Sequence, residues 1–253
     1  MQPANSFDVS LDPTSSSIPA ESRSASMPLA ISFPILFLVA VVSFLLLHYA
    51  FPIFVIDNAL LAQNPPDPVA VAREKAFSRA RLTNSLLAFS TISFIVAIAL
   101  PASLILTKRI HQNAIRYLIP IAVGSALVSC LGVFFGHLVM ELTTSYTLGM
   151  TRTFIGHWLV FGFFGLAIGM AVGLAIGGQK LVAQACQQGF ITGLIAATLF
   201  DLMSVVVPRA QIDSLFPGGV LWGGRDALVV ASWVGLLLLP LAIGLRKFGK
   251  RTK

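Results

Sequence analysis

The chain has 253 residues, of which 56% are hydrophobic and only 11% are charged, and its mean hydropathy is +0.86. A soluble domain carries roughly 25% charged residues, so this composition excludes an ordinary soluble globular protein. The formal net charge of +7 raises the question of nucleic acid, but the sequence has no basic stripe with interleaved aromatic residues and no nucleic-acid-binding motif. We therefore predict an all-α membrane protein that binds no nucleic acid and needs no cofactor.

The N-terminal tail, residues 1–27, is rich in Ser, Pro and Ala, and we expect it to be disordered because it has too little apolar surface to bury. Apolar segments of about the 20 residues that a membrane-spanning helix requires follow it. Together they predict a six-span transmembrane domain over residues 28–245. The expected spans are 29–50, 82–106, 117–142, 154–177, 182–207 and 227–245.

A polar linker at residues 57–81 separates the first two expected spans. Its Asn64–Pro68 segment contains three prolines and is expected to be extended, because proline disfavours the helical conformation of the residue before it. Residues 69–81 carry several Arg and Lys side chains and are expected to form a helix that runs into the second span. We expect this span to kink at Pro101.

The basic C-terminal tail, residues 246–253, directly follows the last expected span, where a cytoplasmic anchor is usually found. Six spans place both termini on the same side of the membrane. With both termini in the cytoplasm, the inside receives the larger share of Lys and Arg, although the basic residues at 73–81 count against this orientation. We predict a multi-pass protein of a bacterial inner membrane with both termini cytoplasmic.

Glycines recur every four residues in the fourth and fifth expected spans. Four residues is just over one helical turn, so the glycines of each span share one stripe of the helix surface. The stripes predict that these two spans pack backbone to backbone in the bilayer. The alternative is a homo-oligomer in which the stripes of several copies line a channel. The expected helix-packing residues are Gly165, Gly169, Gly173, Gly177, Gly189 and Gly193.

Two acidic residues lie in the apolar segments: Glu141 at the end of the third span and Asp201 in the fifth. Charged residues in a membrane segment are rare and mark functional candidates. The interpretation that we favour pairs them with nearby cations, Glu141 with Arg152 and Asp201 with Arg209 or Arg225. The alternative is an ion or proton pathway that uses Asp201 and Glu141.

Three histidines, His48, His137 and His157, are expected on the same side of the membrane because successive spans alternate in direction. His137 and Glu141 stand four residues apart and share a helix face. Together with His157 they are weak candidate ligands for zinc or iron. We favour an interfacial role for the histidines, since a His-x-x-x-Glu pattern alone is not specific for a metal.

The stretch from Gly156–Trp158, through the glycine stripes, to Leu199–Asp201 resembles a glycine-zipper helix pair of uncharacterised bacterial multi-pass membrane proteins. The matching stretch, residues 156–201, is 46 of the chain's 253 residues. It departs from the pattern at Ala196–Ala197, where further glycines are expected. The resemblance implies a membrane location and close helix packing, and it brings no catalytic residues.

We predict a non-enzymatic structural or accessory membrane component whose partners are the lipid bilayer and itself or other membrane proteins. The first alternative is a small transporter or channel with Asp201 and Glu141 in its pathway. A weaker alternative is a metal-dependent membrane enzyme that uses His137, Glu141 and His157.

Overall fold

The computed structural model describes residues 29–50, 53–54, 67–106, 112–142, 149–177, 179–206, 231 and 234–238. Its elements, in chain order, are α1 (Leu29–Ala50), α2 (Asp67–Leu106), the 3-10 helix η2 (Gln112–Tyr117), α3 (Leu118–Leu142), α4 (Gly149–Ile176) and α5 (Gln179–Val206). These ranges contain no strand, so the predicted all-α class is confirmed for them. The two tails and most of the expected sixth span lie outside the described residues, although residues 234–238 are helical.

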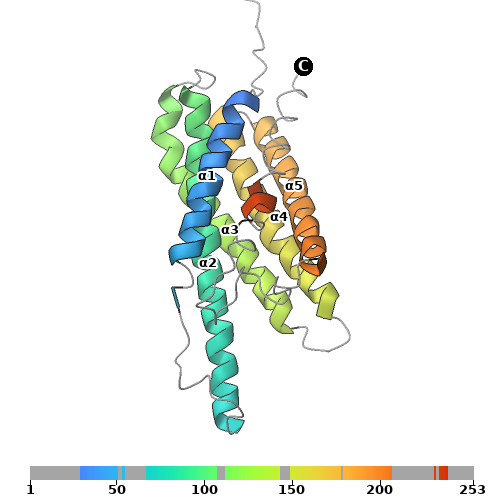
Figure 1. The fold of residues 1–253 in the computed structure, drawn as a ribbon. Helices are drawn as coiled ribbons and strands as arrows, with labels where there is room; N and C mark the ends of the chain where they lie inside the picture. Colours follow the sequence, from blue (N-terminus) through green and yellow to red (C-terminus); the bar gives the residue numbers. More distant parts are fainter. Residues whose placement is uncertain are drawn as a thin grey trace, which may run out of the picture.

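The helices lie side by side and successive helices run in opposite directions (Figure 1). The most central of them is α4, which packs against α2, α3 and α5, whereas α1 packs against α2. The N-terminal part of α2 projects past the other helices at one end of the bundle, the lower end in Figure 1. We call this the α2 end.

Helix α2 joins two segments that the sequence distinguishes. It is 40 residues long, so at 1.5 Å per residue it spans about 60 Å, twice the roughly 30 Å of a bilayer's hydrocarbon core. The polar linker expected at 57–81 is therefore helical from Asp67 onward and continues without a break into the second span. Pro68 lies in the first turn of the helix, where its missing N–H costs little.

Three helical segments of the described chain are long and apolar enough to cross a membrane: Val69–Ile105, Ile115–Leu142 and Thr151–Ile176. The apolar part of α1, Pro34–Ala50, is shorter.

Helices α4 and α5 approach each other so closely that several of their glycines have no room for a side chain. A Cβ atom on Gly165 would lie 2.0 Å from the carbonyl oxygen of Gly189, and a Cβ atom on Gly169 would lie 2.1 Å from that of Ala185. Real Cβ atoms do not come so near to backbone oxygens. At these positions the two backbones are in direct contact.

The α4–α5 interface has an antiparallel register that advances four residues at a time on both helices. Its closest pairs include Gly169 with Ala185, Gly165 with Gly189 and Phe161 with Gly193. One further step toward the α2 end would place His157 opposite Ala197, and the side chain of His157 reaches Asp201, one turn further along the same stripe of α5. Polar residues thus lie on the same helix stripes as the glycines.

Gly177 was expected on the packing stripe of α4, but its part in the structure is different. A Cβ atom on Gly177 would meet nothing within 4 Å, so the residue does not need to be small for packing. Its φ of +90° is left-handed, and its N–H donates to the carbonyl of Gly173 at 3.0 Å. Gly177 therefore ends α4 and starts the short connection to α5.

The two faces of α3 differ from those of a helix on the surface of a soluble protein, which exposes polar residues. Its buried face mixes small and polar residues with apolar ones: Leu118, Ile121, Ala122, Ser125, Ser129, Gly132, Val133, Gly136, His137 and Met140. Its exposed face carries large apolar side chains. They are Ile119, Val123, Leu127, Leu131, Phe134, Phe135, Leu138 and Leu142.

Candidate functional site

Polar side chains form two groups at the α2 end of the bundle. One is the pair His157 and Asp201, between α4 and α5. The other joins Ser78 of α2 to His137 and Glu141 of α3. Both groups contain residues that the sequence marks as candidates, and they differ in how far they are removed from solvent.

The first group is a buried ion pair or hydrogen-bonded pair. His157 Nδ1 lies 2.5 Å from Asp201 Oδ1, within hydrogen-bonding distance. The side chains of His157 and Asp201 are only 1% and 3% exposed. A carboxylate so far from water needs a partner to offset its lost hydration, and the imidazole supplies one.

Aromatic rings surround this pair. The ring of His157 meets Phe200 edge to face at 5.2 Å and Phe161 at 6.3 Å between centroids. Phe161 and Phe200 stack at 5.8 Å, and Phe89 of α2 packs edge to face against Phe161 at 6.1 Å. The surroundings have a low dielectric constant, which strengthens the attraction between the two polar groups.

This partner of Asp201 differs from the cations that the sequence favoured. Arg209 and Arg225 lie outside the described residues, and the printed sequence gives no direct sign that a residue 44 positions earlier is the partner. His157 fills that place because the glycines bring α4 and α5 together, and His157 and Asp201 lie on the same stripes of the two helices just beyond the glycines, within one turn of each other in register.

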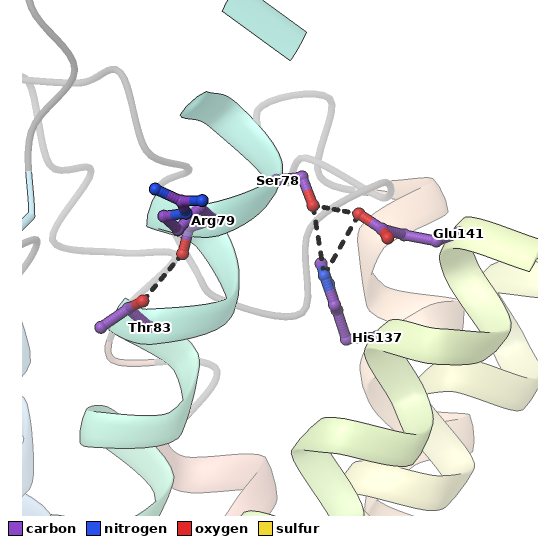
Figure 2. A network of polar contacts seen from close by, with 5 residues as sticks. All are labelled: Ser78, Arg79, Thr83, His137 and Glu141. Atoms are coloured by element: carbon purple, nitrogen blue, oxygen red, sulfur yellow. Dashed lines mark hydrogen bonds and ion pairs between the residues drawn. The ribbon is translucent and has the colours of Figure 1, made fainter. Parts of the chain in front are cut away.

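The second group is the network of Ser78, His137 and Glu141 (Figure 2). The Ser78 hydroxyl donates to Glu141 Oε1 in a short contact, and it lies 3.3 Å from His137 Nε2. His137 Nε2 and Glu141 Oε1 are 3.2 Å apart, four residues apart on α3. The sequence expected Glu141 to pair with Arg152, whereas these contacts join it to His137 and Ser78.

The network contains a serine, a histidine and an acid, but its geometry is not that of a catalytic triad. In a triad the histidine contacts the serine with one ring nitrogen and the acid with the other. Here Ser78 and Glu141 both approach Nε2 of His137, and the Ser78 proton goes directly to the carboxylate. The arrangement does not activate Ser78 as a nucleophile.

The expected metal ligands do not come together. His137 and Glu141 are in contact, but His157 belongs to the other group, with Asp201. His48 stacks on Phe44 at 5.4 Å between centroids. Among the residues that the structure describes, no three His, Cys, Asp or Glu side chains are grouped as a metal site would require.

A cavity of about 970 Å³ adjoins the second group. Its walls come from the projecting part of α2, the last turns of α3 and the start of α4. The charged or titratable side chains around it are Glu74, Lys75, Arg79, Arg81, His137, Glu141 and Arg152. The cavity therefore combines a polar network with a cluster of cations.

The sequence pattern does not indicate that Ser78 and Asn84 make polar contacts with distant parts of the chain. The side chain of Asn84 is fully buried; its oxygen accepts from the N–H groups of Ile53 and Phe54, and its amide donates to the Phe54 carbonyl. Asn84 thus holds the chain beyond α1 against α2. A serine or an asparagine in a long helix has no sequence spacing that would reveal such distant partners.

Comparison with protein-family models, with curated proteins and with solved structures finds no match to this chain.

Proposed function

We propose that this chain is a multi-pass integral protein of a bacterial inner membrane, with six spans and both termini in the cytoplasm, and that it serves as a structural or accessory component. The observation that carries the membrane location is the exposed apolar face of α3. Large apolar side chains cover this outward face, while the Ser residues, Gly132, Gly136 and His137 lie toward the bundle interior. In water such a continuous apolar face is a liability, whereas in lipid it is the solvated surface.

The outward faces of α1 and α5 support the same location. Phe37, Leu38 and Leu45 of α1 are exposed, as are Ile191 and Ile195 of α5. The buried face of α5, in contrast, includes glycines and Asp201. Small residues at helix contacts with apolar residues facing outward are typical of membrane bundles.

A structural or accessory role is supported by the α4–α5 interface. Its backbone contacts leave no space through which an ion or a substrate could pass between the glycines. A helix pair locked in this way is suited to hold a fixed arrangement of spans, and the glycine-zipper resemblance of the same stretch agrees with that use.

Lysine substitution on α3 tests the membrane location. Leu127 is 62% exposed near the middle of the apolar segment, and a lysine at the bilayer centre costs about 2.5–3.5 kcal/mol. We expect Leu127→Lys to lower the amount of folded protein that resists alkaline extraction from membranes. Leu142→Lys, at the helix end, is the control and should have little effect because its ammonium group reaches the interface. Accumulation of folded Leu127→Lys protein in the aqueous fraction would contradict a membrane location.

A proton or ion pathway through Asp201 and Glu141 is the second candidate function. It is favoured by the buried His157–Asp201 contact, because paired ionisable groups within membrane segments recur in proton relays. The test is proton flux into liposomes that contain the purified chain, followed with an enclosed pH-sensitive dye. Asp201→Asn and Glu141→Gln should each abolish flux in a pathway protein, and equal, background flux in all three proteins would leave only the structural role.

A further inference from the structure

The cavity at the α2 end has no part in the structural role proposed above. It lies between the projecting part of α2, the end of α3 and the start of α4. Its volume of about 970 Å³ is at the upper limit of the roughly 300–1,000 Å³ that small-molecule pockets occupy. The space is therefore large enough for a ligand of the size of a lipid headgroup with the first part of its chains.

Among the described residues that line the cavity, cations outnumber carboxylates. Lys75, Arg79 and Arg81 of α2 and Arg152 of α4 stand beside Glu74 and Glu141. Glu141 accepts a hydrogen bond from the Ser78 hydroxyl and contacts His137. The excess of cations over carboxylates favours an anionic ligand.

The four cations reach the cavity from two helices. Lys75, Ser78 and Arg81 are spaced three residues apart on α2 and share the face that meets α3. Arg79 lies on the other side of α2 from Ser78 in Figure 2, and it also belongs to the cavity lining.

The apolar part of the wall continues the outward face of α3. Phe134 and Leu138 line the cavity, and they are also 50% and 39% exposed on that face. A ligand bound beside the cations would therefore meet the same apolar surface that the bilayer would cover. Cations next to an apolar outer face are suited to a molecule with an anionic group and a hydrocarbon chain.

We propose that this cavity binds a phosphate group, presented by an anionic amphiphile. Arg81 and Arg152 contact the phosphate oxygens, which the planar guanidinium group matches with paired hydrogen bonds. Phe134 and Leu138 contact the first carbons of the hydrocarbon chain. The same phosphate chemistry is offered by a membrane lipid or by a soluble phosphate ester, and the two sources are separated by experiment.

The test uses the full chain purified in an uncharged detergent. The probes are phosphatidylglycerol, phosphatidylcholine and glycerol 3-phosphate, and bound probe is counted by native mass spectrometry over a concentration series. We expect phosphatidylglycerol to bind about 10-fold more tightly than phosphatidylcholine. The double variant Arg81→Gln/Arg152→Gln should weaken phosphatidylglycerol binding by about 10- to 30-fold, because each basic residue near a charged lipid contributes about 1 kcal/mol.

Arg116→Gln is the matched control. It removes the same charge, but Arg116 lies in η2 at the start of α3, so the length of α3 puts it roughly 35 Å from Glu141. Its affinity for phosphatidylglycerol should stay within about twofold of the unaltered chain. Circular dichroism establishes that each variant keeps its helix content, and Lys75→Gln, at an exposed residue, provides a second measurement if the double variant does not fold.

The two sources give different results. Phosphatidylglycerol selectivity that persists in millimolar glycerol 3-phosphate assigns the site to a lipid headgroup, whereas binding of glycerol 3-phosphate that displaces the lipid assigns it to a soluble phosphate ester. Equal affinity for the two lipids, with no binding of glycerol 3-phosphate, overturns the proposal. Unchanged affinity in a folded double or Lys75→Gln variant also overturns it. The lipid arm rests on the proposed membrane location, and the glycerol 3-phosphate arm does not.

Discussion

Helix α4 has two very different neighbourhoods. Along α5 its backbone touches the partner backbone, and a Cβ atom at Gly165 or Gly169 would lie 2.0 or 2.1 Å from a carbonyl oxygen. At its N-terminal end, beside α2 and α3, a cavity of about 970 Å³ opens among cations and carboxylates. The same helix therefore forms the tightest contact in the described bundle and one wall of a cavity.

The difference follows from side-chain size. Glycine removes the side chains that normally keep two helices 8–10 Å apart, so α4 and α5 can approach until their backbones meet. At the α2 end, Lys75, Arg81 and Arg152 have long side chains with charged tips, which do not pack into a close interface. Small residues thus produce rigidity, and long charged residues leave room for a ligand.

The polar residues of the two regions follow the same division. His157 and Asp201 are sealed between helices, in contact with each other and with aromatic rings. Glu141 is 52% exposed and faces the cavity through the network of Ser78 and His137. We infer that the buried pair stabilises the packing of the helices and that the exposed network contacts a ligand in the cavity.

The largest expected effect comes from closing the space between α4 and α5. Gly169→Ala would place a Cβ atom 2.1 Å from the Ala185 carbonyl, so the helices must separate and the free energy of unfolding should fall by more than about 3 kcal/mol. Gly124→Ala is the control, because its Cβ would meet Met170 at an ordinary 3.8 Å. Detergent denaturation measures both. Equal stability of the two variants would remove the distinction between tight and open regions.

A smaller effect is expected from Gly177→Ala, which separates backbone conformation from packing. A Cβ atom here has open space, but the φ of +90° is unfavourable for alanine, and the free energy of unfolding should fall by about 1 kcal/mol. The measurement is the same denaturation. A loss as large as that of Gly169→Ala would mean that Gly177 also packs against α5.

The smallest effect is expected at the cavity. Ser78→Ala removes the hydroxyl that donates to Glu141, but the half-exposed carboxylate regains water, so stability should change by less than about 1 kcal/mol. Denaturation of Ser78→Ala beside the unaltered chain measures it. A loss of several kcal/mol would show that the network, like the α4–α5 interface, holds the bundle together.

Much of the fold can be predicted from local pattern. Long apolar runs between polar breaks predict the helices, because each run has the length and composition of a buried or membrane-spanning helix. The start of α2 at Asp67 is less apparent, since its first turns are charged and resemble a linker. The contact of Ser78 with His137 shows that this end of α2 packs against α3, which the local sequence does not reveal.

The sequence carries partial information on one half of the candidate site and none on the other. Glycines four residues apart on two helices joined by a short turn define an antiparallel register, and extending that register places His157 opposite Ala197, one turn before Asp201. The spacing therefore brings Asp201 near His157, but it does not identify the contact between the two side chains. The Ser78 network depends on how α2 crosses α3, which is set by tertiary packing and leaves no periodic trace.

The coupling between His157 and Asp201 tests the central claim that the glycine-lined interface fixes the register of α4 against α5. The measurement is a double-mutant cycle of His157→Ala and Asp201→Ala, with the free energy of unfolding determined for the chain in mixed micelles. Each single variant should lose about 3–5 kcal/mol, because it leaves a buried polar group without its partner. We predict a coupling energy above about 1.5 kcal/mol, and additive losses with coupling below about 0.5 kcal/mol would contradict the register.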